Sequence, residues 1–112
     1  SRAFYLGPRG SGAPWHFHVP AWNALYHGAN HWFLRPPSAA IYSKEAIGSW
    51  LERDYATGSQ LECIQLGGDA MLLPDGWGHA TLNLEASIGV TWELNLLGTG
   101  LQFEHPWSTP TY

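Results

Sequence analysis

The sequence predicts an all-β domain, a barrel or a sandwich, with one inserted α-helix. Short apolar segments recur along the chain and are separated by turns rich in glycine, proline and asparagine. Only residues 43–55 place their apolar side chains at helical spacing. The chain has 112 residues and no visible internal repeat. We therefore expect one domain with a modest core.

The order of the elements follows from where turn residues interrupt the apolar segments. Residues 43–55 are expected to form the helix, packed on the outside of the sheet. Ser43 provides an N-cap, and Gly58 is typical of a helix end. Strands are expected over residues 2–6, 15–19, 30–35, 61–66, 70–73, 80–84 and 88–96, whereas residues 21–27 are mixed in character and could be a turn and a strand.

Charge excludes one class of partner. The net charge is −4 and no basic cluster occurs, so the sequence lacks the electrostatic footprint of a nucleic-acid-binding protein. Only 12% of the residues are charged, against roughly 25% in ordinary soluble domains. The chain also has seven tryptophans. We infer that other protein chains, or the rest of a longer protein, cover part of the surface; a surface of uncharged polar residues is the alternative.

The cysteine content and the length of the apolar runs exclude two further features, an internal disulfide and a membrane span. Cys63 is the single cysteine, so no internal disulfide can form. No apolar run approaches the roughly 18 residues of a membrane span, so no transmembrane segment is expected. The localisation stays unknown, because any targeting segment would lie upstream of Ser1.

Three histidines stand where a metal site could form. Pro74, Asp75 and Gly76 have the chemistry of a tight turn, and His79 follows them at the start of a strand. In a strand over residues 15–19, His16 and His18 would share one face. Three imidazoles that meet inside a β-barrel would form a facial metal site.

Two stretches of the sequence resemble a known superfamily. Gly68, Pro74, Gly76, His79 and Asn83 match the anchors of the second motif of the cupins. Residues 7–18 and 22–37 resemble the Jumonji-C (JmjC) branch, and most of all its small members with His-x-His in the first metal motif. Together the two stretches cover nearly the whole chain, with the motifs in the right order and at the right spacing.

The resemblance implies a particular form of the all-β fold. It implies a double-stranded β-helix, the jelly roll of cupin and JmjC domains, with one inserted α-helix. We expect this domain over residues 1–97. Residues 98–112 are expected to form an extended tail that packs on the domain or on a partner.

The resemblance also implies binding of Fe(II) and 2-oxoglutarate. His16 and His79 match the two metal histidines, and His18 stands where the family has a carboxylate. Thr91 matches a polar contact to 2-oxoglutarate, whereas Asn30 replaces the lysine that pairs with it. A three-histidine site can still hold Fe(II) or another divalent metal. Binding of 2-oxoglutarate is not expected, because a buried dicarboxylate needs a cation or several donors.

The other candidates carry less chemistry. Arg35 is expected outside the barrel, on the strand face opposite to that of Asn30. Glu93 could supply a carboxylate near the pocket, although a position on the rim is the simpler interpretation. The histidines that match no ligand position are interpreted as surface or interface residues: His27, His31 and His105.

Three functions follow from these observations. The first is a non-catalytic or weakly active accessory subunit of a larger assembly, which keeps at most the metal site. The second is an Fe(II)- and 2-oxoglutarate-dependent protein hydroxylase. The third is a three-histidine cupin dioxygenase without cosubstrate. The sequence favours the first, because both the carboxylate and the lysine of the family are replaced.

Overall fold

The computed structural model describes residues 2–55 and 60–94, and these form the all-β jelly roll with one α-helix that the sequence predicts. The helical elements are a 3-10 turn, η1 (Pro37–Ala39), and the helix α1 (Ile47–Asp54). The strands are β1 (Arg2–Gly7), β2 (Gly12–His16), β3 (Ala21–His27), β4 (Ala29–Arg35), β5 (Leu61–Leu66), β6 (Ala70–Leu73), β7 (Gly78–Asn83) and β8 (Ser87–Glu93).

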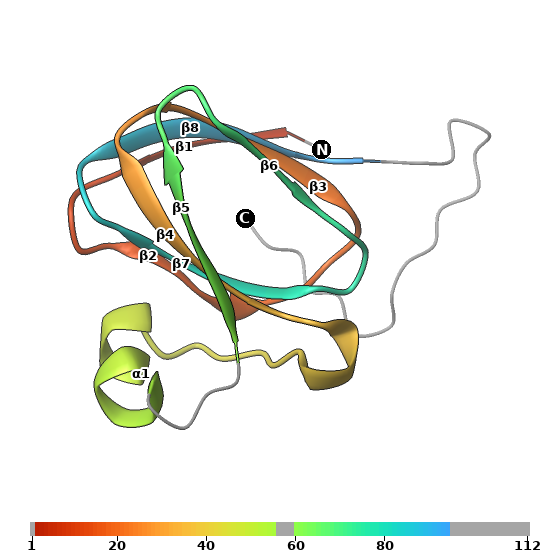
Figure 1. The fold of residues 1–112 in the computed structure, drawn as a ribbon. Coiled ribbons are helices and arrows are strands. Elements are labelled where there is room, and N and C mark those ends of the chain that lie inside the picture. Colours follow the sequence, from red (N-terminus) through yellow and green to blue (C-terminus); the bar gives the residue numbers. More distant parts are fainter. Residues whose placement is uncertain (1, 56–59, 95–112) are drawn as a thin grey trace.

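The strands form two four-stranded sheets, with the orders β1-β8-β3-β6 and β2-β7-β4-β5. Every pairing is antiparallel. The chain passes from one sheet to the other at almost every turn, so the two sheets wind around a common axis as a jelly roll. Figure 1 shows them facing each other, with α1 beneath the β2 and β7 side. Side chains from both inner faces therefore meet between the sheets.

The predicted strand over residues 15–19 is wrong in both of its bounds. The strand begins earlier and ends at His16. Its register against β7 shifts between Ala13 and His16, where β2 carries an extra residue. This bulge places His16 directly opposite His79, and the strand ends there. The sequence pattern gave no signal of the extra residue.

The helix is shorter than predicted. It begins at Ile47, with Ala46 at the N-cap position. The Ser43 hydroxyl accepts a hydrogen bond from the Glu45 backbone amide and so closes a turn ahead of the helix. The predicted N-cap at Ser43 is therefore wrong. Gly58, the predicted end signal, lies outside the described residues, as do residues 95–96 of the last predicted strand and the tail over 98–112.

The main apolar cluster lies outside the jelly roll, between the β2-β7-β4-β5 sheet and α1. As expected, the guanidinium of Arg35 faces this side, with its central carbon 5.0 Å from the centre of the Trp15 ring. Because the cluster is outside, the space between the sheets can hold polar side chains. No helix in the described part of the chain is long and apolar enough to cross a membrane. The cluster consists of Trp15, Phe33, Ile47, Trp50 and Ala80.

Candidate metal centre and cavity

Three imidazoles converge at one end of the space between the sheets. His16 and His79 are cross-strand partners, and their ring centres are 4.1 Å apart. His18 follows β2 in a loop, and its backbone carbonyl accepts a hydrogen bond from the Gly76 amide at 3.0 Å. The turn before His79 thus holds the loop that carries His18. One nitrogen of each ring lies within 4.8 Å of a nitrogen of each of the other two rings.

The predicted convergence of His16, His18 and His79 agrees with this geometry, although not for the expected reason. His18 is not on the strand, so a shared strand face does not bring it to the site. The turn of residues 74–76 does so instead. That the three residues are metal ligands stays a prediction.

Each imidazole is oriented by a backbone carbonyl at its Nδ1 atom. A carbonyl can only accept, so each Nδ1 carries a proton. Metal-binding histidines are typically held in this way, by a partner on the nitrogen that does not bind the metal. The pairs are His16 with Pro14 at 2.7 Å, His18 with Val19 at 2.6 Å, and His79 with Trp77 at 3.0 Å.

Burial keeps two of these rings neutral. Burial lowers the pKa of His16 to about 4; the Pro14 carbonyl opposes this shift, and the neighbouring His18 adds to it. Burial also lowers the pKa of His79 well below its ordinary value, and both neighbouring histidines act in the same direction. The neutral ring is the form that binds metals. Within the described part of the chain, Nε2 of His79 is buried and has no hydrogen-bond partner.

These residues fit a divalent transition metal. Imidazole nitrogen suits iron, copper, zinc and nickel, and the buried Nε2 of His79 would gain the partner that it lacks. The set supplies no negative ligand, because His18 stands where the family has a carboxylate. A bound metal would therefore keep its full positive charge and would differ in affinity and redox behaviour from the usual family site.

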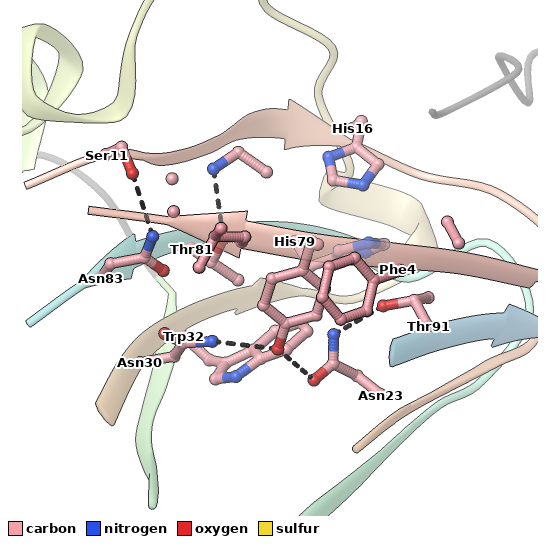
Figure 2. Close-up of a pocket in the computed structure, with 16 residues that line it drawn as sticks. Phe4, Ser11, His16, Asn23, Asn30, Trp32, His79, Thr81, Asn83 and Thr91 are labelled. Carbon is pink, nitrogen blue, oxygen red and sulfur yellow. Dashed lines mark hydrogen bonds between the residues drawn. The ribbon is translucent and has the colours of Figure 1, made fainter. Parts of the chain in front are cut away.

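A cavity of about 270 Å³ extends from the histidines between the sheets. Figure 2 shows His16, His79 and a second group, of amide and hydroxyl side chains, around this cavity. Tyr5 is central to this second group: its hydroxyl donates to Oδ1 of Asn23 at 3.1 Å and accepts from Nδ2 of Asn30 at 3.4 Å. Asn23 in turn donates to the hydroxyl of Thr91 at 2.7 Å. Ser87 donates to Oδ1 of Asn30 at 2.8 Å.

Asn30 and Thr91, the two predicted 2-oxoglutarate contacts, therefore belong to one hydrogen-bonded network. Sequence reasoning missed Tyr5 and Ser87 as members of it. The sequence gave no signal for Tyr5, because the exposed positions of β1, Phe4 and Leu6, are also apolar, and only the structure shows which side of the strand is buried. Ser87 could be recognised only from the fold, since it precedes the predicted strand.

The cavity does not fit a dicarboxylate that is held by a cationic side chain, as the resemblance implies. None of the described residues that line it carries a formal charge. Glu93 is not among them, which agrees with a position on the rim. Arg35 stacks against the tryptophans outside the barrel, and Arg53 pairs with Asp54 of the helix and with Glu45, which precedes it. The other three cationic side chains of the chain are exposed: Arg2, Arg9 and Lys44.

The remaining histidines lie away from the cavity, where the structure describes them. His31 is on the outer side of its sheet and pairs with Glu62 at 2.8 Å. His27 is exposed at the end of β3. His105 lies outside the described residues.

Comparison with known proteins shows that the chain is similar to JmjC proteins. No family model matches it. Human JmjC domain-containing protein 8 is 33% identical over 95 residues, which cover 80% of this chain and 36% of that protein. Arginine-specific demethylase JMJ22 of Arabidopsis thaliana is 32% identical over 110 residues. The 2-oxoglutarate and iron-dependent oxygenase JMJD4 of Gallus gallus is 31% identical over 106 residues. These matches cover 80% of this chain but only 22% and 25% of the two proteins.

Solved structures agree on the fold. The cupin domain of Drosophila melanogaster CENP-C superposes with a TM-score of 0.55 over 80% of this chain and 57% of that chain, at 8% identity. Two facing antiparallel sheets with imidazoles clustered at one end of the inner space define a cupin with a candidate metal centre. Together with the curated relatives, these features show that the chain is similar to the JmjC branch of the cupin superfamily. It spans about a third, or less, of the length of those relatives.

Proposed function

We propose that this chain is a metal-binding JmjC-type domain that does not use 2-oxoglutarate and serves as a non-catalytic accessory part of a longer protein or assembly. The observation that carries the proposal is the contrast within one cavity. Three imidazoles are each oriented by a backbone carbonyl at one end, whereas no cationic residue lines any part of the described cavity. A divalent metal there would supply Lewis acidity and a positive charge.

The residues of the chain would have separate roles. His16, His18 and His79 would hold the metal through Nε2, each fixed by its carbonyl partner. Tyr5 and Asn23 keep the far end of the cavity closed by bonding to each other. Their hydrogen-bonding groups are used within the protein, so an entering diacid would have to break these bonds and would meet no opposite charge.

The relatives support an alternative, an Fe(II)-dependent oxygenase. One of them is named as a 2-oxoglutarate and iron-dependent oxygenase and another as an arginine-specific demethylase. In this alternative a protein hydroxylase would have to accept 2-oxoglutarate through uncharged contacts. A three-histidine dioxygenase without cosubstrate would instead use the uncharged cavity for its own substrate.

Thermal unfolding of the purified chain separates these functions. Addition of Fe(II) under anaerobic conditions, or of Zn(II), should raise the melting temperature, and metal analysis should approach one ion per chain. Addition of 2-oxoglutarate to the metal-loaded protein should leave the melting temperature unchanged. The matched control is the double variant His18→Asp, Asn30→Lys, which restores the family residues and should gain a response to 2-oxoglutarate.

Two results would contradict the proposal. A rise in the melting temperature of the unmodified, iron-loaded chain with 2-oxoglutarate, accompanied by release of carbon dioxide, would establish the cosubstrate-dependent oxygenase. Consumption of oxygen by the iron-loaded chain without 2-oxoglutarate would establish the cosubstrate-free dioxygenase. Absence of metal binding would remove the metal centre from the proposal.

A further inference from the structure

The outer side of the β1-β8-β3-β6 sheet is apolar and lies on the side of the molecule opposite α1. Tyr5, Asn23 and Thr91 are joined by hydrogen bonds within the cavity, so their neighbours along each strand lie on the other side of the sheet. Phe4 and Leu6 also border the cavity, yet both are largely exposed. We call the outward side chains the outer apolar face. They are Phe4 and Leu6 of β1, Trp22 of β3, Leu72 of β6, and Val90 and Trp92 of β8.

The pairing of the strands makes these side chains neighbours. Phe4 pairs with Val90, and Trp22 pairs with both Trp92 and Leu72. Among the described residues Phe4 is 68% exposed, Leu6 69% and Leu72 53%. Contiguous apolar side chains on this scale usually mark a surface that something covers.

We propose that the segment after β8, residues 95–112 of this chain, covers the outer apolar face. The chain leaves β8 at this sheet, where the Leu94 amide donates to the Pro20 carbonyl at 2.7 Å. The segment therefore starts at the edge of the face. Its 18 residues span up to about 60 Å when extended, which exceeds the length of a strand of this sheet several times.

The composition of the segment suits an apolar surface. Residues 95–112 contain one charged side chain, Glu104, and no lysine or arginine. Phe103 and Trp107 supply large apolar side chains, and two prolines disfavour a helix. A tethered segment also competes well against separate molecules, because its effective concentration at the face is in the millimolar range. These features favour the chain's own segment over a second copy.

The experiment measures access to the face in the full chain. Leu6 is replaced by cysteine in a Cys63→Ser background, and the rate of alkylation by a maleimide is followed by mass spectrometry. The control places the cysteine at Lys44, an exposed residue next to α1. Because a covered site reacts only when it opens locally, we expect Leu6→Cys to react at least about tenfold more slowly than Lys44→Cys. Adding Phe103→Ser and Trp107→Ser should remove this difference.

Each other outcome has a definite meaning. Equal rates at the two cysteines would overturn the proposal, since the face would then be open. Protection that survives the Phe103→Ser, Trp107→Ser change would overturn it in favour of another occupant. Protection that increases with protein concentration would identify that occupant as a second copy. Should Leu6→Cys fail to fold, Phe4→Cys reports on the same face with the same expected rates.

Discussion

The two ends of the cavity differ in how their hydrogen bonds are used. At the histidine end, a backbone carbonyl accepts a hydrogen bond from Nδ1 of each ring, and one nitrogen of each ring lies within 4.8 Å of the others. At the amide end, Tyr5, Asn23 and Asn30 bond to one another. The histidine end is thus arranged to receive a cation, whereas the side chains at the amide end use their hydrogen-bonding groups on one another.

Removal of a ring from the histidine end should have the largest effect. His79→Ala deletes the ligand whose Nε2 is buried without a partner, and we expect metal affinity to fall at least about 100-fold. Isothermal titration with Zn(II) measures the loss. His31→Ala is the matched control, because His31 lies on the outer side of the sheet, and its affinity should equal that of the parent. Equal losses in the two variants would place the metal elsewhere.

Acid should destabilise the metal-free protein through the histidine end of the cavity. The pKa of His16 is about 4 in the folded chain, against an ordinary value of 6.5, because burial disfavours the charged ring. As the pH falls below 6.5, the histidine binds a proton in the unfolded chain but not yet in the folded chain. The contribution of His16 to the free energy of unfolding is therefore complete above pH 6.5 and is lost as the pH falls toward 4. The loss should be on the order of 3 kcal/mol.

Urea unfolding at a series of pH values measures this decline. His16→Gln removes the titrating ring while retaining a polar side chain, so its stability should depend less on pH across the same interval. An unchanged slope in that variant would show that other groups cause the acid sensitivity.

The two ends also differ in how far they could be predicted. The histidine end could be inferred from sequence, because the motif spacing survives in His16, His18 and His79. The bulge in β2 and the loop that carries His18 could not, since an extra residue in a strand has no reliable signature in the apolar pattern. Asn30 and Thr91 were also identified from the sequence, but their bonding partners depend on strand register. Pairing between strands far apart in the chain sets that register.

The same limit applies to the fold as a whole. Seven of the eight strands could be located from turn residues and apolar segments, β3 was left open between a turn and a strand, and the resemblance supplied the arrangement. The helix began four residues later than predicted, because Ser43 bonds within a local turn instead of capping α1. Local hydrogen bonds of this kind compete with the helix start, and sequence alone does not decide between them.

The smallest expected effect is at the amide end. Tyr5→Phe removes only the hydroxyl that donates to Asn23 and accepts from Asn30, and it retains the ring. Two amide groups then lose a partner, so we expect the free energy of unfolding to fall by about 1–2 kcal/mol. Metal affinity should not change, because the Tyr5 hydroxyl bonds to Asn23 and Asn30 and not to His16, His18 or His79. Unfolding in urea, with zinc titration in parallel, tests both statements. A loss of metal affinity in Tyr5→Phe would mean that the two ends of the cavity act as one unit, and the comparison drawn between them would fail.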